Sequence, residues 1–515
     1  MTIKGKRIFN YRPLCVFAAL LILGIILGEA VYGEHIAFII AMCVLTALAF
    51  ILLVCFKRVR RFFYIPIAML IGLIGITTSN AVYDSGMISD YSGKFSATVA
   101  SEIIVDSDST TFYVTDIRID GKKLKYDCYV YISFPLEPDF NAGDVVLLNG
   151  VITSNIHTKF DTRYGSNRAT GRGYFASVST VSKRSEGDAP FPLNFQLAIK
   201  RALFSNTDEY TASICQALIL GDKRGIDSGL YDNISSSGLA HVLAVSGLHI
   251  SLLAGALYFL LKKLKLNPKI AFIAVTVLTF LYSMLCSFTA SSLRAFIMCG
   301  VLMFSSAFSK KRDNLSALSL AAVLILIFRP TAILEVGFLL SFYSVLGIFL
   351  FYKPFRCVGM RAVHKLSPKR HVGKRFVDVC AVSLATNLMT LPLVAMFFGK
   401  LPTLFILSNF IVLPYVMAIY VLLLICTFLT LITTFGGFVW IMKFLLIPFR
   451  VYVGVIGGLS FSTIQVSASA AMIVCFTVIA LFMSRFVFLR RRSKAIGAAA
   501  MTSASVIICA LCALI

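Results

Sequence analysis

Long apolar blocks separated by short basic clusters restrict the possible folds of this chain more than any other feature. A helix needs roughly 20 apolar residues to cross a hydrocarbon core about 30 Å thick, and the sequence offers about 13 such blocks. Hydrophobic residues make up 58% of the 515 residues and charged residues only 14%, which excludes an ordinary soluble domain. The sequence therefore predicts a polytopic α-helical membrane protein.

The basic residues flank the apolar blocks and predict how the chain crosses the membrane. Cytoplasmic loops carry an excess of Lys and Arg, so we interpret most of the net charge of +24 as a topology signal, not as a nucleic-acid-binding surface. The first block is long enough to remain as an anchor, unlike a cleaved signal peptide. The alternation places the N-terminus in the cytoplasm and the C-terminus outside. The expected spans are about 14–32, 36–56, 62–80, 239–261, 270–288, 292–308, 314–329, 336–352, 377–398, 404–432, 438–459, 467–489 and 495–515.

Residues 88–185 have a different pattern from the rest of the chain. Turn signals separate five β-branched or aromatic runs, which lie at 95–104, 111–119, 124–134, 144–154 and 174–181. Because the preceding span crosses outward, we expect this insert to lie outside the cell. Five short strands predict an external OB-like β-barrel.

The last strand of the insert and the segment before it combine basic with aromatic residues. Barrels of this type bind single-stranded nucleic acid by stacking bases on aromatic rings beside cations. The earlier half of the insert is acidic, so a solvated loop with ordinary barrel aromatics is an equal alternative. The DNA-binding candidates are Lys159, Phe160, Arg163, Tyr164, Arg168, Arg172, Tyr174 and Phe175.

Four regions follow from these patterns. Residues 1–87 form the N-terminal transmembrane helices, and residues 88–185 form the external barrel. Residues 186–235 are too polar to span the membrane, and the helical spacing of their apolar side chains predicts an amphipathic interfacial segment. Residues 236–515 form a second, larger transmembrane domain.

Several polar side chains lie inside the predicted spans, where each needs a functional or structural reason. His241 and His249 are eight residues apart, about 80° around one helix, so both can line a polar interior together with Ser246. Packing between helices is the alternative. Arg294 can instead extend to the outer interface or pair with Glu335, and the asparagines can instead bond helix to helix. The channel-lining candidates are His241, Ser246, His249, Arg294, Glu335, Asn387, Lys400 and Asn409.

The sequence predicts neither a metal site nor an enzyme. Most cysteines lie inside apolar blocks, where a thiol behaves as a small hydrophobe, and the histidines are scattered singly without HxxxH spacing. No GxxxxGK[ST] phosphate loop is present. We interpret Asp222, Arg224 and Asp227, which lie in a Gly-rich turn, as helix caps and turn residues rather than a cation site. We therefore expect no catalytic residue and no cofactor.

Several sequence motifs resemble one known family. AHVLAVSGLHISLLAG (240–255), preceded by ALILGDKRGI (217–226), resembles the signature of the ComEC family of DNA-internalisation proteins used in natural transformation. SSLRAFIM (291–298), VGFLLSFYSVLGI (336–348) and LMTLPLVAMFFGKLPTLFILSNFIVLPY (388–415) are similar to later landmarks of the family in the same order. The order of modules also matches, so the resemblance covers nearly the whole chain.

The resemblance implies a multi-pass channel of the bacterial plasma membrane, formed by residues 236–515, that passes single-stranded DNA into the cytoplasm. It also implies a DNA receptor outside the cell and an ATP-driven translocase inside, with membrane lipid around the helices. Many family members carry an external metallo-β-lactamase-like domain with an HxHxDH-type cluster, which this sequence lacks. The nuclease is therefore expected to be a separate polypeptide, the task of another protein, or absent.

Two hypotheses from other classes stay open at this point. One is a transporter or flippase of an envelope metabolite, because proton relays use the same polar groups as a channel. The other is a non-transporting membrane scaffold whose barrel docks a partner. A DNA pore predicts binding of single strands that weakens steeply as salt rises, whereas a metabolite carrier does not.

Overall fold

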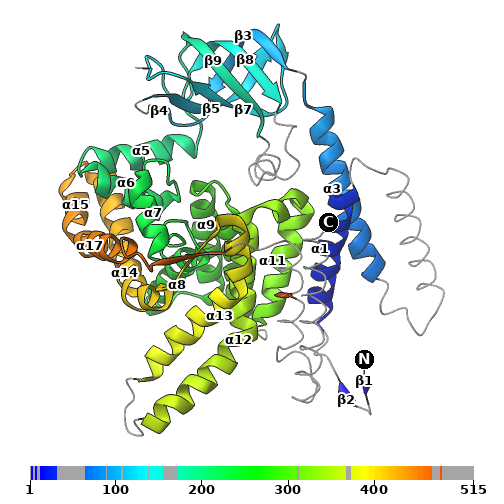
Figure 1. The fold of residues 1–515 in the computed structure, drawn as a ribbon, viewed down its shortest axis with the longest axis vertical. Coiled ribbons are helices and arrows are strands. Elements are labelled where there is room, and N and C mark those ends of the chain that lie inside the picture. Colours follow the sequence, from blue (N-terminus) through cyan, green and yellow to red (C-terminus); the bar gives the residue numbers. More distant parts are fainter. Residues whose placement is uncertain are drawn as a thin grey trace. The chain divides into compact units, whose positions relative to one another are not determined.

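The computed structural model describes residues 2–3, 6–7, 12–31, 64–88, 90–105, 108–136, 138–154, 172–309, 313–366, 373–466 and 476–477. The chain divides into two compact units, which we describe separately (Figure 1). One unit contains Leu14–Ile199 and Ser319–Phe338, and the other contains Met1–Pro13, Lys200–Leu318 and Leu339–Ile515. The spans predicted at 36–56 and 495–515 lie outside the described residues, as does nearly all of the span predicted at 467–489.

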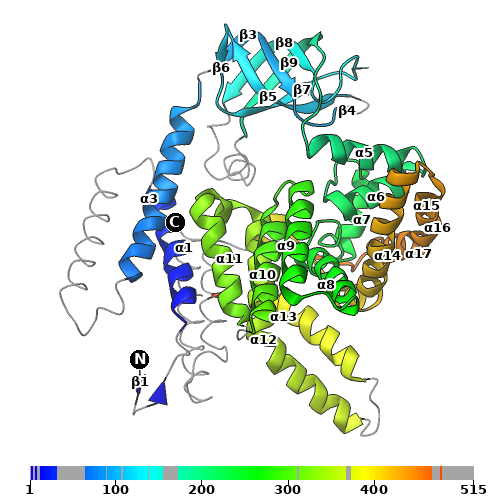
Figure 2. The same ribbon diagram turned by 180° about the vertical axis from the view of Figure 1, so that it is seen from behind.

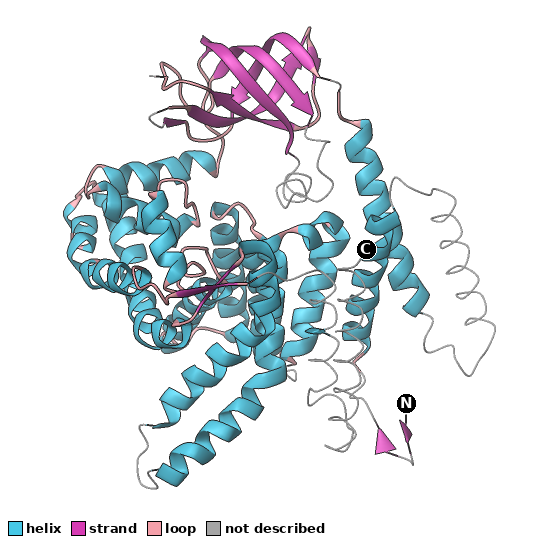
Figure 3. Ribbon diagram, in the orientation of Figure 1, coloured by secondary structure: helices cyan, strands magenta, loops and turns pink. Residues whose placement is uncertain are grey.

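The first unit contains a mixed β-sheet (Figure 3). Its strands are β3 (Tyr91–Val99), β4 (Ile104–Val105), β5 (Thr110–Ile119), β6 (Lys122–Lys123), β7 (Asp127–Ile132), β8 (Val145–Ser154) and β9 (Arg172–Ser185). They follow the order β3-β8-β9-β7-β5-β4, and β6 pairs with β5. Strand β3 pairs with β5 as well as with β8. All pairings are antiparallel except that of β7 with β9.

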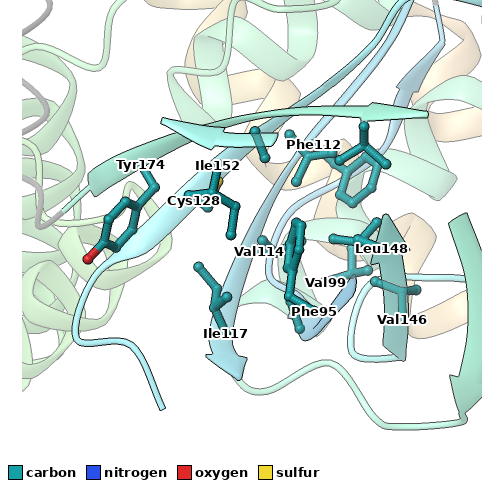
Figure 4. Packing of buried hydrophobic residues seen from close by; sticks show 14 of the residues in the cluster. Phe95, Val99, Phe112, Val114, Ile117, Cys128, Val146, Leu148, Ile152 and Tyr174 are labelled. Atoms are coloured by element: carbon teal, nitrogen blue, oxygen red, sulfur yellow. The ribbon is translucent and has the colours of Figure 1, made fainter. Parts of the chain in front are cut away.

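Alternating side chains of these strands enclose the core of the insert. Phe95, Phe112, Cys128 and Tyr174 are buried there together with Val, Ile and Leu side chains (Figure 4). Four of the five strands lie where the sequence predicts them. The first was predicted at 95–104 but begins at Tyr91 and ends at Val99. The sequence pattern missed its start because Gly93 and Lys94 belong to residue types that are depleted in strands.

Two long helices precede the sheet, α1 (Pro13–Val31) and α3 (Tyr64–Ser85). Glycine allows their backbones to approach closely: a Cβ atom on Gly24 would lie 2.3 Å from the carbonyl oxygen of Met69. Small residues at such contacts are typical of membrane helices. In addition, Asn80 Nδ2 donates to Glu29 Oε2 at 2.7 Å.

The second unit consists mainly of helices (Figure 2). They are α6 (Glu209–Leu220), α7 (Ser228–Ser236), α8 (Gly247–Lys263), α9 (Pro268–Leu285), α10 (Ala290–Ala307), α12 (Val336–Leu366), α13 (Gly373–Phe398), α14 (Phe405–Thr433), α15 (Gly437–Trp440), α16 (Met442–Leu445) and α17 (Ile447–Gly457). Helices α5 (Leu193–Phe204) and α11 (Asn314–Phe328) belong in part to each unit, as does α12 through its first turn, and the 3-10 helix η3 (Pro330–Leu334) lies in the first. Two antiparallel pairs of short strands complete the fold, β1 (Thr2–Ile3) with β2 (Lys6–Arg7) and β10 (Lys400–Pro402) with β11 (Thr463–Gln465).

Eight helices of the described part of the chain are long and apolar enough to cross a membrane. The prediction of a polytopic helical membrane protein is thereby confirmed in its class, and the number of 13 spans stays a prediction. The span predicted at 239–261 is shorter than expected, because α8 has 17 residues. Helix α11 has 15 residues and nearly matches the span predicted at 314–329. The predicted span at 239–261 does not start until Gly247, because the segment before it forms turns.

The segment predicted as amphipathic and interfacial contains three helices, α5, α6 and α7. In α6 every residue from Thr211 to Ile219 is buried. This helix therefore does not lie on a surface, because both of its faces are covered. Asp208 begins it as the N-cap, and Gly221 ends it in the left-handed conformation with φ of 76°.

A buried carboxylate fixes one turn of the insert. Asp144 is only 4% exposed, and its two oxygens accept from the backbone N–H groups of Asn141 (2.8 Å) and Gly187 (2.9 Å). Lys183 Nζ lies 3.2 Å from Oδ2. The N–H of Asn141 contributes most to lowering the pKa of Asp144, and burial opposes it.

We predict that Asp144→Asn lowers the free energy of unfolding of the insert by about 1–3 kcal/mol, because an amide group cannot accept from both backbone donors. Limited proteolysis of the purified protein across a urea series measures the change. Since the pKa is lowered in the folded state, the stabilisation is present above the unfolded value of 3.8 and is lost as the pH falls through the folded value. The gap between wild type and variant should therefore close in acid. The exposed Asp139→Asn is the matched control, and an equal loss in both variants would contradict the prediction.

Candidate functional site

The loop between α7 and α8 is the centre of the candidate site. The motif AVSGLHIS (244–251) begins in this loop and continues into α8. Most apolar side chains of the loop are buried, although loops usually run over protein surfaces. Four of its apolar side chains are at most 4% exposed, namely Leu239, Val242, Leu243 and Val245. These side chains anchor an irregular backbone inside the helical unit.

Ser246 and His249 together cap the start of α8. Ser246 Oγ accepts from the backbone N–H of Leu248 at 3.2 Å, and His249 Nδ1 accepts from the backbone N–H of Ser246 at 3.0 Å. This reciprocal arrangement is a capping box in which histidine takes the place of the usual Glu or Gln. Because Nδ1 accepts, the ring carries its proton on Nε2 in the neutral tautomer.

The His249 ring is fully buried. It lies edge-on to the ring of Tyr420, with the two centroids 4.5 Å apart. Its Nε2 atom has no hydrogen-bond partner among the described residues. A buried N–H donor without a hydrogen-bond acceptor lowers the stability of the folded protein.

His241 does not share a helix with His249, so the predicted common helical face is wrong. The structure places His241 in the turns before α8, where its side chain is exposed. The helix cannot extend back to it because Ser246 adopts the extended conformation of an N-cap, with ψ of 166°. The lining role of both histidines stays a prediction.

Arg294 of α10 lies against the first turn of α8. Its guanidinium is close enough to Gly247 that a Cβ atom there would be 2.5 Å from Nη2. Arg294 is 6% exposed, and its Nε has no hydrogen-bond partner among the described residues. No carboxylate pairs with it in the part of the chain that the structure describes; Glu335, the predicted partner, pairs with Arg329 at 2.7 Å instead.

A chain of hydroxyl groups continues from the site through the helices. Tyr420 of α14 donates to the hydroxyl of Tyr282 in α9 at 2.9 Å. Tyr282 in turn donates to the carbonyl of Ile219 at 2.7 Å, one of the carbonyl groups left free near the end of α6. Both tyrosines are at most 6% exposed, so three helices are joined by buried polar contacts.

A second set of hydroxyl contacts holds the loop on its other side. Ser408 of α14 is fully buried and donates to the carbonyl of Ser237 at 2.6 Å. Tyr452 of α17 donates to the Ser408 hydroxyl at 3.0 Å. The loop is therefore hydrogen-bonded at its start, through Ser237, and capped at its end, through Ser246.

The remaining channel-lining candidates make no hydrogen bond to this cluster within the described part of the chain. Asn387 Nδ2 donates to Ser383 within its own helix at 2.9 Å, which gives it a local structural contact. Lys400 is exposed on β10, opposite Gln465 of β11. Asn409, in the second turn of α14, is 6% exposed, and its Oδ1 has no partner among the described residues.

The DNA-binding candidates of the insert are only partly described. Lys159, Phe160, Arg163, Tyr164 and Arg168 lie outside the described residues, and Arg172 is described only as the first residue of β9. Tyr174 is 1% exposed; its hydroxyl accepts from Ile88 and donates to Gly86. Tyr174 is therefore a core residue that cannot stack on a base, whereas Phe175 points to the opposite face of the strand.

The polar turn that precedes α7 forms local contacts, as the sequence predicts. Asp227 is the N-cap of α7 and accepts from the backbone N–H of Leu230 at 3.1 Å. Asp222 accepts from Arg224 Nε at 2.8 Å and from Gln216 Nε2 at 3.0 Å. Among the described residues, no cluster of three His, Cys, Asp or Glu side chains could hold a metal ion.

Sequence reasoning missed the three tyrosines and Ser408. Tyr282, Tyr420 and Tyr452 lie inside apolar blocks, where an aromatic residue usually belongs to the core. The available signal was the hydroxyl itself, because a buried tyrosine normally finds a hydrogen-bond partner.

The fold and this enclosed polar site define a polytopic helical membrane protein with a β-sheet insert. The model of the family described as "Competence protein" matches residues 218–492. This match covers more than half of the chain and includes the α7–α8 loop, α10 and α14. The chain therefore belongs to this family, and the resemblance found in the sequence is confirmed.

Two curated proteins are similar to parts of the chain. ComE operon protein 3 of Bacillus subtilis (strain 168) is 27% identical over 246 residues, which cover 46% of this chain and 29% of that protein. Competence protein ComA of Neisseria gonorrhoeae is 26% identical over 213 residues, which cover 39% of this chain and 28% of that protein. The chain thus spans less than a third of the length of these relatives. No solved structure matches it.

We predict that Gly247→Ala lowers the free energy of unfolding by about 1–3 kcal/mol, because the new methyl group would overlap the buried guanidinium of Arg294. The matched control is Gly255→Ala in the same helix, where a Cβ atom meets nothing within 4 Å. That change should be neutral or stabilising by up to about 1 kcal/mol. Thermal unfolding in detergent micelles measures both.

A double-mutant cycle tests whether the overlap with Arg294 is the cause. In an Arg294→Ala background the cost of Gly247→Ala should largely disappear, because the two changes then no longer interact. An unchanged cost in that background would show that Gly247 is needed for another reason.

Proposed function

We propose that this chain forms a membrane channel that passes single-stranded DNA into the cytoplasm during natural transformation. Membership of the Competence protein family supports this proposal, as do the eight candidate spans in the described residues. The chain is embedded in the bacterial plasma membrane with its N-terminus in the cytoplasm and its C-terminus outside. A separate ATP-driven translocase pulls the strand from inside, and a separate DNA receptor acts outside.

The observation that carries the proposal is the enclosed cation at the start of α8. Arg294 is buried among helices, and no described carboxylate neutralises it. An unneutralised charge inside a membrane protein is costly and marks a pathway or a ligand site. The N-terminus of α8 carries a positive partial charge beside the guanidinium, so the local field favours a polyanion such as DNA.

The described conformation corresponds to a closed channel in this proposal. His249 is enclosed against Tyr420, and the path at this level would open when α8 and α14 separate. Opening would expose both Arg294 and the Nε2–H of His249, which could then donate to phosphate oxygens. Asn409, also buried with a free acceptor, would contribute hydrogen bonding along the same helix.

The insert takes the part of an OB-type barrel outside the membrane. The pairing of β3 with both β8 and β5, and the parallel pairing of β7 with β9, support this topology. In the proposal, the insert receives the single strand before it reaches the helical unit.

We expect Arg294→Gln to lower the uptake of labelled DNA by host cells about tenfold or more, because it removes a cation from the path; a loss of about 1.4 kcal/mol suffices for tenfold. The exposed Arg361→Gln on α12 is the matched control and should leave uptake within about twofold. Fluorescently labelled DNA, counted inside cells deleted for the chromosomal copy, provides the measurement.

Protein stability distinguishes this functional role from a structural one. Arg294→Gln removes an unpaired buried charge, so the free energy of unfolding should stay level or rise, by up to about 3 kcal/mol. A variant that loses uptake and stability together would instead make Arg294 a structural residue. Uptake that is unchanged when the whole chain is deleted would remove the channel proposal.

A further inference from the structure

Four aromatic side chains form a continuous row across three strands of the insert. Tyr113 of β5 lies opposite Tyr129 of β7, and Tyr129 lies opposite Phe175 of β9. Tyr131, two residues along β7, completes the row. The ring centroids are 5.0 Å apart for Tyr113 and Tyr129, 6.0 Å for Tyr129 and Phe175, and 6.3 Å for Tyr131 and Phe175.

The row lies on the outer face of the sheet. Along each strand the intervening residues, among them Phe112, Cys128 and Tyr174, point into the core and are at most 1% exposed. The rings of the row are only partly buried. Neither the Tyr129 nor the Tyr131 hydroxyl has a hydrogen-bond partner among the described residues, and neither is a buried polar atom, so both are in contact with solvent.

Sheet stabilisation alone does not explain this arrangement. Cross-strand aromatic pairs each stabilise a sheet by a few tenths of a kcal/mol to about 1 kcal/mol, but a solvent-facing side of a sheet is normally polar. Beside the row, the same face carries the polar residues Ser177, Thr153 and Asn149 and the aliphatic Val151, which is 42% exposed. Aromatic surface is therefore concentrated on β5, β7 and one end of β9.

Charge in the neighbouring sequence indicates an anionic ligand. Residues 155–171 connect β8 to β9 and contain three basic residues and one acidic residue, which gives a net charge of +2 (3 − 1). Strand β9 then begins at Arg172, three residues before Phe175, where Arg172 lies opposite Asp127 of β7. Aromatic rings beside cations are the combination that binds single-stranded nucleic acid.

We propose that the row formed by Tyr113, Tyr129, Tyr131 and Phe175 binds single-stranded DNA by stacking on its bases. The proposal rests on the proposed function and names the surface of the insert that would take the strand. The ring spacings of 5.0–6.3 Å exceed the 3.4 Å rise per nucleotide of a duplex strand, about which bases stack on each other. Neighbouring bases can therefore reach different rings only when the strand is stretched, so the row selects single strands over duplex DNA.

The test compares variants of the full-length protein, purified in detergent micelles, by fluorescence anisotropy of a labelled oligo-dT probe. Tyr129→Leu with Tyr131→Leu keeps apolar side chains on the strand but removes two π-faces. The Kd should rise about tenfold or more. Tyr129→Phe keeps the ring and should bind like wild type. Labelling of the buried Cys128 thiol, read by mass spectrometry, verifies that the insert of each variant stays folded.

Salt separates stacking from phosphate contacts. Stacking releases no counterions, so the fold-loss caused by the double variant should be the same at about 0.05 M and about 0.5 M salt, whereas a lost phosphate contact would matter less at high salt. A loss that vanishes at high salt overturns the stacking proposal. A duplex probe should bind with a higher Kd than oligo-dT, and the ratio of the two Kd values should be smaller for the double variant than for wild type.

The remaining outcomes distinguish this proposal from the channel proposal. If wild type and the folded double variant bind oligo-dT equally, the row is not the binding surface, and the channel proposal is untouched. If the row binds a soluble oligosaccharide and not oligo-dT, single-stranded DNA is not the ligand of this surface and the stacking proposal fails. If cellular uptake of DNA does not depend on the chain at all, the channel proposal fails, whatever the binding assay gives.

Discussion

The hydrogen bonds at the start of α8 are the interaction on which the helical unit depends. A loop enclosed by helices cannot leave its backbone groups to water, so they must be satisfied by the protein. Ser246 and His249 do this for the first N–H groups of the helix, and Ser408 does it for the carbonyl of Ser237. Only with these contacts can an irregular segment remain inside a unit that is otherwise apolar.

The same contacts determine where the charged and aromatic groups lie. Because α8 begins at Gly247, the absence of a side chain there leaves room for the Arg294 guanidinium. Because His249 turns back to cap the helix, its ring meets Tyr420, and Tyr420 in turn reaches Tyr282. One capping interaction thus links the consecutive helices α8, α9 and α10 with α14, which begins about a hundred residues further along the chain.

The sequence predicted the class of fold well, because each element has its own local signal. Apolar length predicted the helices, and β-branched or aromatic runs between turn signals predicted strands β5, β7, β8 and β9. The predictions failed where a tertiary contact or the direction of a side chain determines the local structure. Periodicity placed His241 and His249 on one helix, but the N-cap at Ser246 makes the helix begin between them. Pattern alone also placed Tyr174 and Phe175 together in a binding surface, although adjacent strand residues point to opposite faces.

The buried tyrosines and the solvent-facing tyrosines of this chain differ in the direction of their side chains, and this difference determines what each ring can bind. Tyr174, Tyr282 and Tyr420 are buried, and each hydroxyl is satisfied within the protein, so their rings act as structure. Tyr129 and Tyr131 have rings of the same kind, but their hydroxyls meet solvent. An accessible aromatic ring takes no part in the internal hydrogen bonds of the protein. Its face becomes buried only when a flat ligand stacks on it.

Arg294 presents the same argument for charge. A buried guanidinium without a described counterion makes the folded state less stable than a neutral side chain would, since its desolvation is not offset by an ion pair. Such a group is compatible with the fold because the helix cap, the tyrosine chain and the Ser408 contacts hold the surrounding helices in place. A residue that binds a ligand can lower the stability of the folded protein while neighbouring contacts compensate for the loss. The surroundings of Arg294 fit this pattern.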